Sequence, residues 1–288
     1  MPDTLYINGR FTTTDERVIG VEDRGFQFGD SVYEVFKFLE SKPLFIRDHF
    51  RRLSQGLAEI EVPNPWDEAS FTAAMAALLE RTSFEEGIVY VQVTRGEAER
   101  THFYPSGMTP TALAYSRRFT FPDAARKELG IRLVTARDLR WKRCNIKSTN
   151  LLANVMAKSH ARRTGADEAL LIDEGEVREG ASSSFFAVQQ GRLITSPADP
   201  RILPGTVRDS VISLAVGLRI RVDERPLRAD ELLTLDEAFI TSTTQGVMPV
   251  AEIDGRVIGN SRRGQTTTVL QEAFDSLERG QVSGESGQ

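Results

Sequence analysis

Apolar and polar side chains alternate along several short segments of the chain, a period of two that indicates β-strands. The clearest example is residues 31–39, where Val32, Phe36 and Phe38 fall on one face of the predicted strand. Glu34 falls on the same face, which is a small anomaly for a charged residue. The remaining predicted strands cover residues 88–94, 111–116, 131–136, 169–173, 176–178, 185–188, 192–195, 219–223 and 238–242.

Turn signals join some of these strands into hairpins. Asn-Gly at residues 8–9 separates the short runs 5–7 and 10–12, which is a strong hairpin signal. Gln-Gly at residues 190–191 lies between two of the predicted strands and pairs them in the same way. Most neighbouring strands are therefore expected to be antiparallel.

Apolar residues spaced three or four apart predict helices between the strands. The spacing at positions 50, 53, 57 and 60 gives one helix. A second helix is predicted to begin with Asn64 as N-cap and Pro65 in its first turn. Its buried stripe is expected to comprise Phe71, Met75, Leu78 and Leu79, and further helices are expected at residues 149–163, 206–216 and 262–277.

The order of these elements predicts an α+β protein of two domains, with mostly antiparallel strands and flanking helices. Residues 118–129 change to charged residues with a proline, which indicates a linker between the domains. The expected division is a small N-terminal α+β domain at residues 1–117 and a large C-terminal domain at residues 130–277. Residues 278–288 are rich in Gly, Ser, Gln and Glu and are expected to be disordered.

Composition narrows the class of protein. The 288 residues are 40% apolar and 27% charged, as in soluble globular proteins. A net charge of −5 gives no basic face for nucleic acid. A single cysteine cannot form an intrachain disulfide, and we find neither a signal peptide nor a membrane-length apolar run. The expectation is a soluble cytoplasmic protein.

Common catalytic signatures are missing from the sequence. It contains no dinucleotide-binding glycine pattern, no P-loop and no nucleophile elbow. The three histidines, at positions 49, 102 and 160, lack metal-ligand spacing, so no metal site is expected.

The stretch RWKRCNIKSTNLL at residues 140–152 holds four cations and the only cysteine. Lys147 is predicted to lie where a strand ends and a helix begins, with Ile146 and two leucines beside it. Such partial burial favours the neutral amine, which forms Schiff bases with carbonyl groups, although lysines at such positions are more often solvated. Lys142 lacks the apolar flank and is expected to be exposed, and Cys144 is expected to be buried rather than nucleophilic.

Two further segments could bind phosphate. In LPGTVRD, residues 203–209, Pro-Gly precedes a predicted helix whose first N–H groups point outward. In ITSTTQG, residues 240–246, a strand ends in hydroxyl groups. Each signal is weak alone, because any helix start or ordinary turn shares it.

Polar residues elsewhere could contact a ligand. Glu179 precedes a glycine and three consecutive serines, residues 182–184, although a glutamate there is ordinarily a turn residue. Arg100 and His102 are two apart, so in an extended segment they point the same way and could bind a carboxylate. The alternative for this pair is a solvated loop.

Five ordered blocks together resemble the fold-type-IV pyridoxal-phosphate aminotransferases, and among these the D-amino-acid aminotransferases. The resemblance covers residues 6 to about 274. Two positions depart from the family pattern, with Phe26 where tyrosine is frequent and Ala181 in place of serine. The blocks are EDRGFQFGDSVYEV at 22–35, VTRG at 93–96 with RTH at 100–102, RCNIKS at 143–148, EGASSS at 179–184 and TSTT at 241–244.

The resemblance implies a cofactor, pyridoxal 5′-phosphate, and a role for each matching residue. Lys147 matches the lysine that holds the cofactor as a Schiff base and moves the proton, and Glu179 matches the carboxylate beside the pyridine nitrogen. Trp141 and Ser182 match supporting residues. The phosphate ligands are matched by Arg52, Thr206, Val207 and Thr243, and the substrate carboxylate ligands by Tyr33, Arg100 and His102.

The resemblance also implies the reaction and the assembly. A D-amino acid such as D-alanine gives its amino group to 2-oxoglutarate, yielding a 2-oxo acid and D-glutamate. Arg100 and His102 are expected to reach the site of a neighbouring subunit in a homodimer. The alternatives are an (R)-amine or branched-chain aminotransferase, an aminodeoxychorismate-type lyase of the same fold, or a non-catalytic protein that binds the cofactor.

Overall fold

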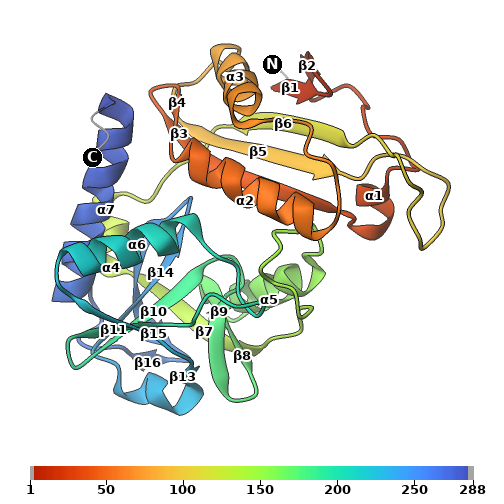
Figure 1. Ribbon diagram of the computed structural model, residues 1–288. Coiled ribbons are helices and arrows are strands. Elements are labelled where there is room, and N and C mark those ends of the chain that lie inside the picture. Colours follow the sequence, from red (N-terminus) through yellow and green to blue (C-terminus); the bar gives the residue numbers. More distant parts are fainter. Residues whose placement is uncertain (1–2, 285–288) are drawn as a thin grey trace. The chain divides into compact units, whose positions relative to one another are not determined.

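The computed structural model describes residues 3–284, and the chain forms two compact units (Figure 1). The described part of unit 1 comprises residues 3–120, 146–150 and 281–284. Unit 2 comprises Phe121–Asn145 and Leu151–Gly280. The α+β class and the mostly antiparallel strands are confirmed.

Unit 1 is a six-stranded antiparallel sheet in the order β2-β1-β6-β5-β3-β4, with helices α2 and α3 on one face (Figure 1). The Asn-Gly hairpin is confirmed, with Ile7 opposite Arg10. The strands are β1 (Thr4–Ile7), β2 (Arg10–Thr13), β3 (Ser31–Leu39), β4 (Lys42–Pro43), β5 (Gly87–Thr94) and β6 (Thr111–Arg117), and the helices are α1 (Arg24–Phe28), α2 (Ile46–Glu59) and α3 (Glu68–Glu80).

The core of unit 1 lies between the helices and one face of the sheet. Strand alternation sends Val32, Phe36 and Phe38 of β3 into this core, as their spacing predicted. Phe71 of α3 has no exposed surface, and its ring packs on those of Phe36 and Trp66. The whole predicted stripe of α3, Phe71, Met75, Leu78 and Leu79, is buried.

The start of α3 differs from the prediction. The helix begins at Glu68, and its N-cap is Asp67, whose side chain forms a reciprocal capping box with Ser70. Asn64 instead accepts the Trp66 N–H at 3.1 Å within the preceding turn. Both residues are good caps, and the better bonded one, Asp67, sets the helix start.

Unit 2 contains a ten-stranded sheet with the path β12-β11-β10-β14-β15-β7-β8-β9-β13, and β16 pairs with β15. The pairs β11–β12, β15–β7 and β7–β8 are parallel and the others antiparallel. The strands are β7 (Ile131–Arg137), β8 (Glu168–Asp173), β9 (Glu176–Gly180), β10 (Ser184–Gln189), β11 (Arg192–Thr195), β12 (Arg221–Glu224), β13 (Leu227–Arg228), β14 (Glu237–Ser242), β15 (Gly246–Ile253) and β16 (Arg256–Val257).

Helices and a buried apolar core complete unit 2. Phe186 and Phe239 of neighbouring strands stack at 4.8 Å, and neither is exposed. Within residues 3–284, no helix combines the length and apolar character that crossing a membrane requires. The helices are α4 (Ala124–Leu129), α5 (Leu152–Arg163), α6 (Thr206–Gly217), a 3-10 helix (Ala229–Thr234) and α7 (Gln265–Ser283).

Three segments depart from the predicted division of the chain. The expected linker, residues 118–129, contains helix α4, which begins where the Asp123 side chain accepts the Arg126 N–H. Residues 146–150 group with unit 1 although unit 2 residues flank them on both sides. The expected disordered tail, residues 278–288, is helical to Ser283 because Glu278 still packs as a buried residue of α7. Residues 285–288 of that tail lie outside the described residues.

Substitution of Phe71 tests the unit 1 core. We expect Phe71→Ala to lower the free energy of unfolding by about 3–5 kcal/mol, since it removes a fully buried ring and leaves a cavity. Denaturant unfolding would measure the change. Leu233→Ala is the control: its side chain is 62% exposed, and we expect a change within about 0.5 kcal/mol. Equal losses in the two variants would contradict the assignment of the core.

Candidate active site

Lys147 lies on the segment Ile146–Asn150, which runs beside β3 in unit 1. The Tyr33 backbone N–H donates to the Lys147 carbonyl at 3.0 Å, and Ser148 forms an isolated antiparallel bridge with β3. Ile146 is buried in the unit 1 core. The segment is therefore fixed on both sides of the half-buried lysine, whose Nζ lies 4.3 Å from the centroid of the Tyr33 ring.

The predicted position of Lys147 at a strand-to-helix junction was wrong. β7 ends at Arg137 and α5 begins only at Leu152. The helix was expected to begin near Thr149, but the Thr149 N–H donates to the Ser31 carbonyl of β3 at 3.2 Å. Bonding to a strand of unit 1 replaces the first helical turn, so the lysine lies in a long connection.

Glu34 is the anomaly on the apolar face of β3, and the structure explains it. Arg52 of α2 donates to both Glu34 oxygens, from Nε at 2.7 Å and from Nη2 at 2.9 Å. His49, one turn earlier on the same helix, lies with Nδ1 2.8 Å from Glu34 Oε2. Glu34 has no exposed surface and Arg52 is 9% exposed, so the pair is buried and bidentate.

The charges of this cluster are set by burial and by one another. Burial opposes ionisation of Glu34, but the Arg52 guanidinium and His49 hold the pKa of this carboxyl well below its usual range. Burial lowers the pKa of His49, although its contact with Glu34 opposes the shift. The positive charges of Arg52 and Lys147 lower it further. At neutral pH the cluster is therefore a carboxylate and a guanidinium beside a neutral imidazole.

Tyr33 lies on the other face of β3, away from Glu34. Its ring stacks on Tyr90 of β5 at 5.6 Å, and Tyr90 stacks on Tyr115 of β6 at 5.2 Å. Burial raises the pKa of Tyr90, so it remains a phenol. This row of rings fixes the orientation of the Tyr33 ring beside Lys147.

The loop between β5 and β6 carries Arg100 and His102, and buried Arg24 of α1 holds its backbone. Arg24 Nη1 donates to the Thr101 carbonyl at 2.8 Å, and its Nε donates to Asp30 at 3.0 Å. Asp30 also accepts from Arg95 at 2.8 Å. A half-buried carboxylate shared by two buried arginines thus fixes the start of the loop.

Phe28 orients the two side chains of interest on this loop. The Arg100 guanidinium carbon lies 5.0 Å from the Phe28 ring centroid, and the His102 ring lies at 5.9 Å. Both side chains are exposed and lie against the same ring. This arrangement agrees with the prediction that they point the same way, and cation–π attraction stabilises Arg100 there.

Glu179 of β9 lies in unit 2 and is buried. Arg140 Nη1 donates to Glu179 Oε1, and the Leu203 N–H donates to the same oxygen at 3.0 Å. Arg140 also donates to both oxygens of Asp138, at 3.0 Å from Nε and 2.8 Å from Nη2. Burial raises the pKa of Glu179, while the Arg140 charge opposes the shift.

Helix α6 begins with Thr206 and Val207, as predicted, and no side chain caps it. The first intrahelical bond to its N-cap runs from Asp209 N to Gly205 O at 3.0 Å, so the N–H groups before it have no acceptor in the helix. A Cβ at Gly205 would lie 2.8 Å from the Ser184 hydroxyl. Glycine therefore lets the open helix end approach β10.

The second predicted phosphate segment lies close to this helix end. Ser184 pairs with Thr241 of β14, and the chain then turns through Thr243 into β15. Thr243 is half-buried, and the Thr241 hydroxyl is buried without a hydrogen-bond partner. The start of α6 and the end of β14 thus both neighbour Ser184 in unit 2, and their amides and hydroxyls are donors that suit a phosphate.

Ser182 and Trp141 both lie in unit 2. The Ser182 hydroxyl donates to Glu168 Oε2 at 2.6 Å, and Lys158 pairs with the same oxygen at 2.9 Å. The Trp141 carbonyl accepts from the Cys144 thiol at 3.1 Å. Lys142 is exposed and Cys144 is buried, as predicted.

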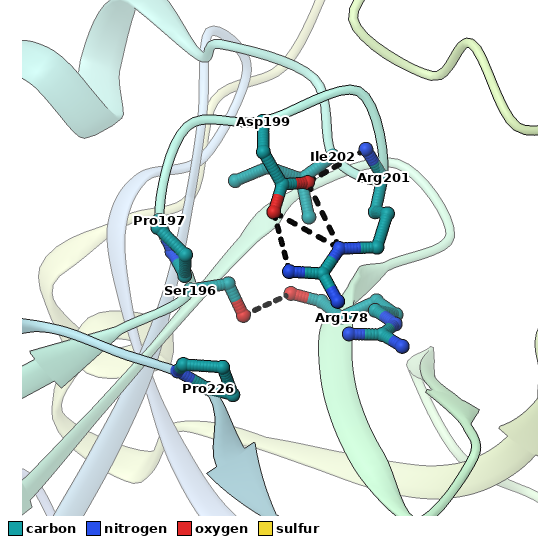
Figure 2. Close-up of a pocket in the computed structure, with 7 residues that line it drawn as sticks. All are labelled: Arg178, Ser196, Pro197, Asp199, Arg201, Ile202 and Pro226. Carbon is teal, nitrogen blue, oxygen red and sulfur yellow. Dashed lines mark hydrogen bonds and ion pairs between the residues drawn. The ribbon is translucent and has the colours of Figure 1, made fainter.

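A small pocket elsewhere in unit 2 contains none of the predicted site residues (Figure 2). Asp199 accepts from Arg201 Nε at 2.9 Å, and the Arg178 guanidinium is paired with Glu176 and Asp173. Because these charges are already matched, we assign the pocket no ligand. The lining residues are Arg178, Ser196, Pro197, Asp199, Arg201, Ile202 and Pro226.

The structure thus builds two groups of predicted residues, one in each unit. Lys147, Tyr33, Arg52 and the Arg100–His102 pair belong to unit 1. Glu179, Ser182, the start of α6 and Thr243 belong to unit 2.

Sequence reasoning did not identify the residues that hold Arg52 and Glu179 in place. These are Glu34 in unit 1, and Arg140 with Asp138 in unit 2. The misplaced charge of Glu34 was a usable signal, because such a residue requires a partner such as Arg52. Asp138 and Arg140 gave no signal, since an acid and a base two residues apart are ordinary on a protein surface.

Comparison with known proteins matches residues 31–253 to the amino-transferase class IV family. Relatives include the D-alanine aminotransferase of Bacillus licheniformis, 39% identical over 272 residues that cover 94% of this chain and 96% of that protein. The D-alanine aminotransferase of Staphylococcus haemolyticus is 34% identical over the same shares of the two chains.

Solved structures of branched-chain aminotransferases share the fold. The Escherichia coli enzyme superposes with a TM-score of 0.90 at 25% identity, covering 98% of this chain and 96% of that one. A further branched-chain aminotransferase, solved with pyridoxamine 5′-phosphate, gives a TM-score of 0.88 at 25% identity, covering 98% and 95%.

The burial of Cys144 predicts an unreactive thiol. Burial raises the pKa of Cys144 to about 11, from 9.0, although Arg140 opposes the shift. At about pH 8 the thiolate fraction, and with it the rate of iodoacetamide alkylation, should fall about 100-fold below that of an ordinary cysteine. The control is the same protein unfolded in guanidinium chloride. Equal rates in the folded and unfolded protein would contradict this assignment.

Proposed function

Because the chain belongs to the amino-transferase class IV family, we propose that it moves the amino group of a D-amino acid, such as D-alanine, to 2-oxoglutarate. The products are a 2-oxo acid and D-glutamate. The main observation behind this choice of substrate is that Arg100 and His102 both lie against the Phe28 ring. Together they offer two groups that can carry a positive charge and bind a carboxylate. The relatedness to D-alanine aminotransferases supports the same choice.

Enzymes of this class use pyridoxal 5′-phosphate, and the donor set of this chain fits it. When bound, this cofactor supplies an electron sink for the charge left when the substrate α-proton departs. Lys147 would form the Schiff base, Glu179 would face the ring nitrogen and Ser182 would support the ring. The phosphate would be held by Arg52, the Thr206 and Val207 N–H groups and the Thr243 hydroxyl.

Lys147 can act as the proton carrier because its amine has a flexible stem and a fixed backbone. The Tyr33 N–H bond and the buried Ile146 hold that backbone. The flexible stem therefore lets Nζ move while the backbone at Lys147 stays fixed. An arginine could not replace it, because a guanidinium does not give up its proton in a protein.

Glu34 and His49 orient Arg52 for its role. Glu34 accepts from Nε and Nη2 of the guanidinium, which fixes the plane of the group, and His49 holds Glu34 through Nδ1. A guanidinium held in this way can bind a phosphate without losing further side-chain entropy. Glu34 also compensates the buried positive charge of Arg52.

Arg100 and His102 would serve the site of a neighbouring copy in a homodimer. Their side chains are exposed on a loop whose backbone is held by Arg24. Phe103 beside them and Phe26 of α1 are 72% and 74% exposed. Large exposed rings next to polar ligands are typical of a surface that another chain covers.

A branched-chain aminotransferase is the second candidate, favoured by the structures that share the fold. An (R)-amine aminotransferase or an aminodeoxychorismate-type lyase would use the same cofactor residues. Steady-state assays with D- and L-amino acids and 2-oxoglutarate separate these functions. We expect D-alanine to be consumed and L-leucine to be left, and the reverse result would overturn the proposal.

Borohydride reduction tests the role of Lys147. We expect the protein isolated with its cofactor to lose its yellow colour and to carry the cofactor mass on a peptide that contains Lys147, since only a Schiff base is fixed by reduction. Lys142→Ala is the control, because Lys142 is exposed and should leave labelling unchanged. Labelling that persists in Lys147→Ala would remove the assignment.

Arg100→Ala tests the carboxylate site. We expect the KM for D-alanine to rise about 10- to 100-fold while the cofactor stays bound, because a charge-assisted hydrogen bond of about 1.5–3 kcal/mol is lost. Arg118→Ala is a matched control, an exposed arginine that lies on a phenylalanine ring elsewhere in unit 1. An unchanged KM in Arg100→Ala would contradict the proposed role.

A further inference from the structure

Asp138, Arg140 and Glu179 form a buried chain of charges in unit 2. Arg140 lies between the two carboxylates, bidentate to Asp138 and singly bonded to Glu179. The three side chains are 10%, 7% and 5% exposed. Asp138 also accepts the backbone N–H of Arg140 at 2.9 Å, which closes the turn after β7.

With both carboxylates ionised, this chain carries a net charge of −1, because two carboxylates share one guanidinium. Within residues 3–284, no other cation is hydrogen-bonded or ion-paired to either carboxylate. Arg201 contributes only its carbonyl, which accepts from Arg140 at 3.2 Å, while its guanidinium is bound to Asp199. The remaining titratable neighbour is Cys144, a neutral thiol at physiological pH.

The bonding of Glu179 leaves one of its oxygens available. Both of its donors, Arg140 Nη1 and the Leu203 N–H, bond to Oε1. No donor in the described part of the chain bonds to Oε2. The unmatched negative charge is therefore available, at Oε2 of a fixed carboxylate, to a ligand group that meets this oxygen.

We propose that Asp138, acting through Arg140, leaves this cluster with an excess negative charge. The cluster therefore favours a ligand that is protonated at the atom that contacts Glu179. The inference rests on the proposed function, in which that proton lies on the ring nitrogen of pyridoxal 5′-phosphate. Asp138 is a positioning residue, since it contacts Arg140 and not the ligand.

Asp138 matters because it is a second carboxylate partner of Arg140, so Arg140 does not neutralise Glu179 alone. Were Glu179 the only partner of Arg140, the buried pair would be neutral and would gain little from a further proton. With Asp138 present, two hydrogen bonds of the guanidinium are directed away from Glu179. A protonated ring nitrogen then completes the charge balance of a buried site, where unmatched charge is costly.

The experiment is an NMR titration of the ring nitrogen, using ¹⁵N-labelled pyridoxal 5′-phosphate bound to the full-length protein. We expect Asp138→Asn to lower the pH at which the nitrogen loses its proton, raising the deprotonated fraction about tenfold or more at a given pH. An unchanged titration midpoint in Asp138→Asn would overturn the inference.

Asp173→Asn is the matched control. It removes an equal charge that is paired with Arg178, 3.2 Å away, and not with the cluster. We expect its titration to match that of the wild type, and a shift equal to that of Asp138→Asn would overturn the inference. Asp138→Glu keeps the charge and should restore the wild-type midpoint.

Binding to the apoprotein gives a second measurement that does not require the substituted protein to fold. The wild type should bind pyridoxal 5′-phosphate at least about tenfold more tightly than an analogue with carbon in place of the ring nitrogen. Equal affinities would overturn the inference while leaving the proposed function intact. Failure of the wild type to bind either compound would overturn the proposed function itself.

Discussion

Pairing of a buried carboxylate with a buried arginine is the interaction on which both units depend. Unit 1 holds Glu34 against Arg52, and unit 2 holds Glu179 against Arg140. Neither charge is tolerable alone, because loss of one partner leaves an unmatched ion in the interior. The two pairs differ in net charge. Glu34 is matched by Arg52, whereas Glu179 shares its arginine with Asp138, so the first cluster is neutral and the second is anionic.

That difference suits each cluster to a different kind of group, the first to an anion and the second to a group that carries a proton. In unit 1 the Arg52 guanidinium is held in place by Glu34, and in unit 2 the Glu179 carboxylate keeps an oxygen that no donor in the described part of the chain bonds to. Backbone amides at the start of α6 add donors without adding charge. Chemistry of this kind depends on groups held in advance rather than on groups that move into place.

Local patterns predicted many elements of the fold, because strand alternation and helical spacing record which face is buried. They missed β15, whose residues are mostly buried on both faces and so do not alternate. Residues 31–39 and the stripe of α3 followed those patterns. Prediction failed where a distant partner decides the local structure. Thr149 bonds to Ser31 and does not begin a helix. The N-cap of α3 is Asp67 and not Asn64. Asp138 and Arg140 could not be predicted for the same reason. Their importance depends on the contact of Arg140 with Glu179, which is distant in sequence.

The segment Ile146–Asn150 has a consequence for the order in which the protein can be made. It belongs to unit 1, yet the chain reaches it only after β7 of unit 2 has been synthesised. Ile146 completes the first core, so unit 1 cannot close around its full set of residues while the ribosome has supplied residues 1–120 alone. Folding of unit 1 is therefore completed only after part of unit 2 has been synthesised. The segment that completes it, which bridges to β3, is the one that carries Lys147.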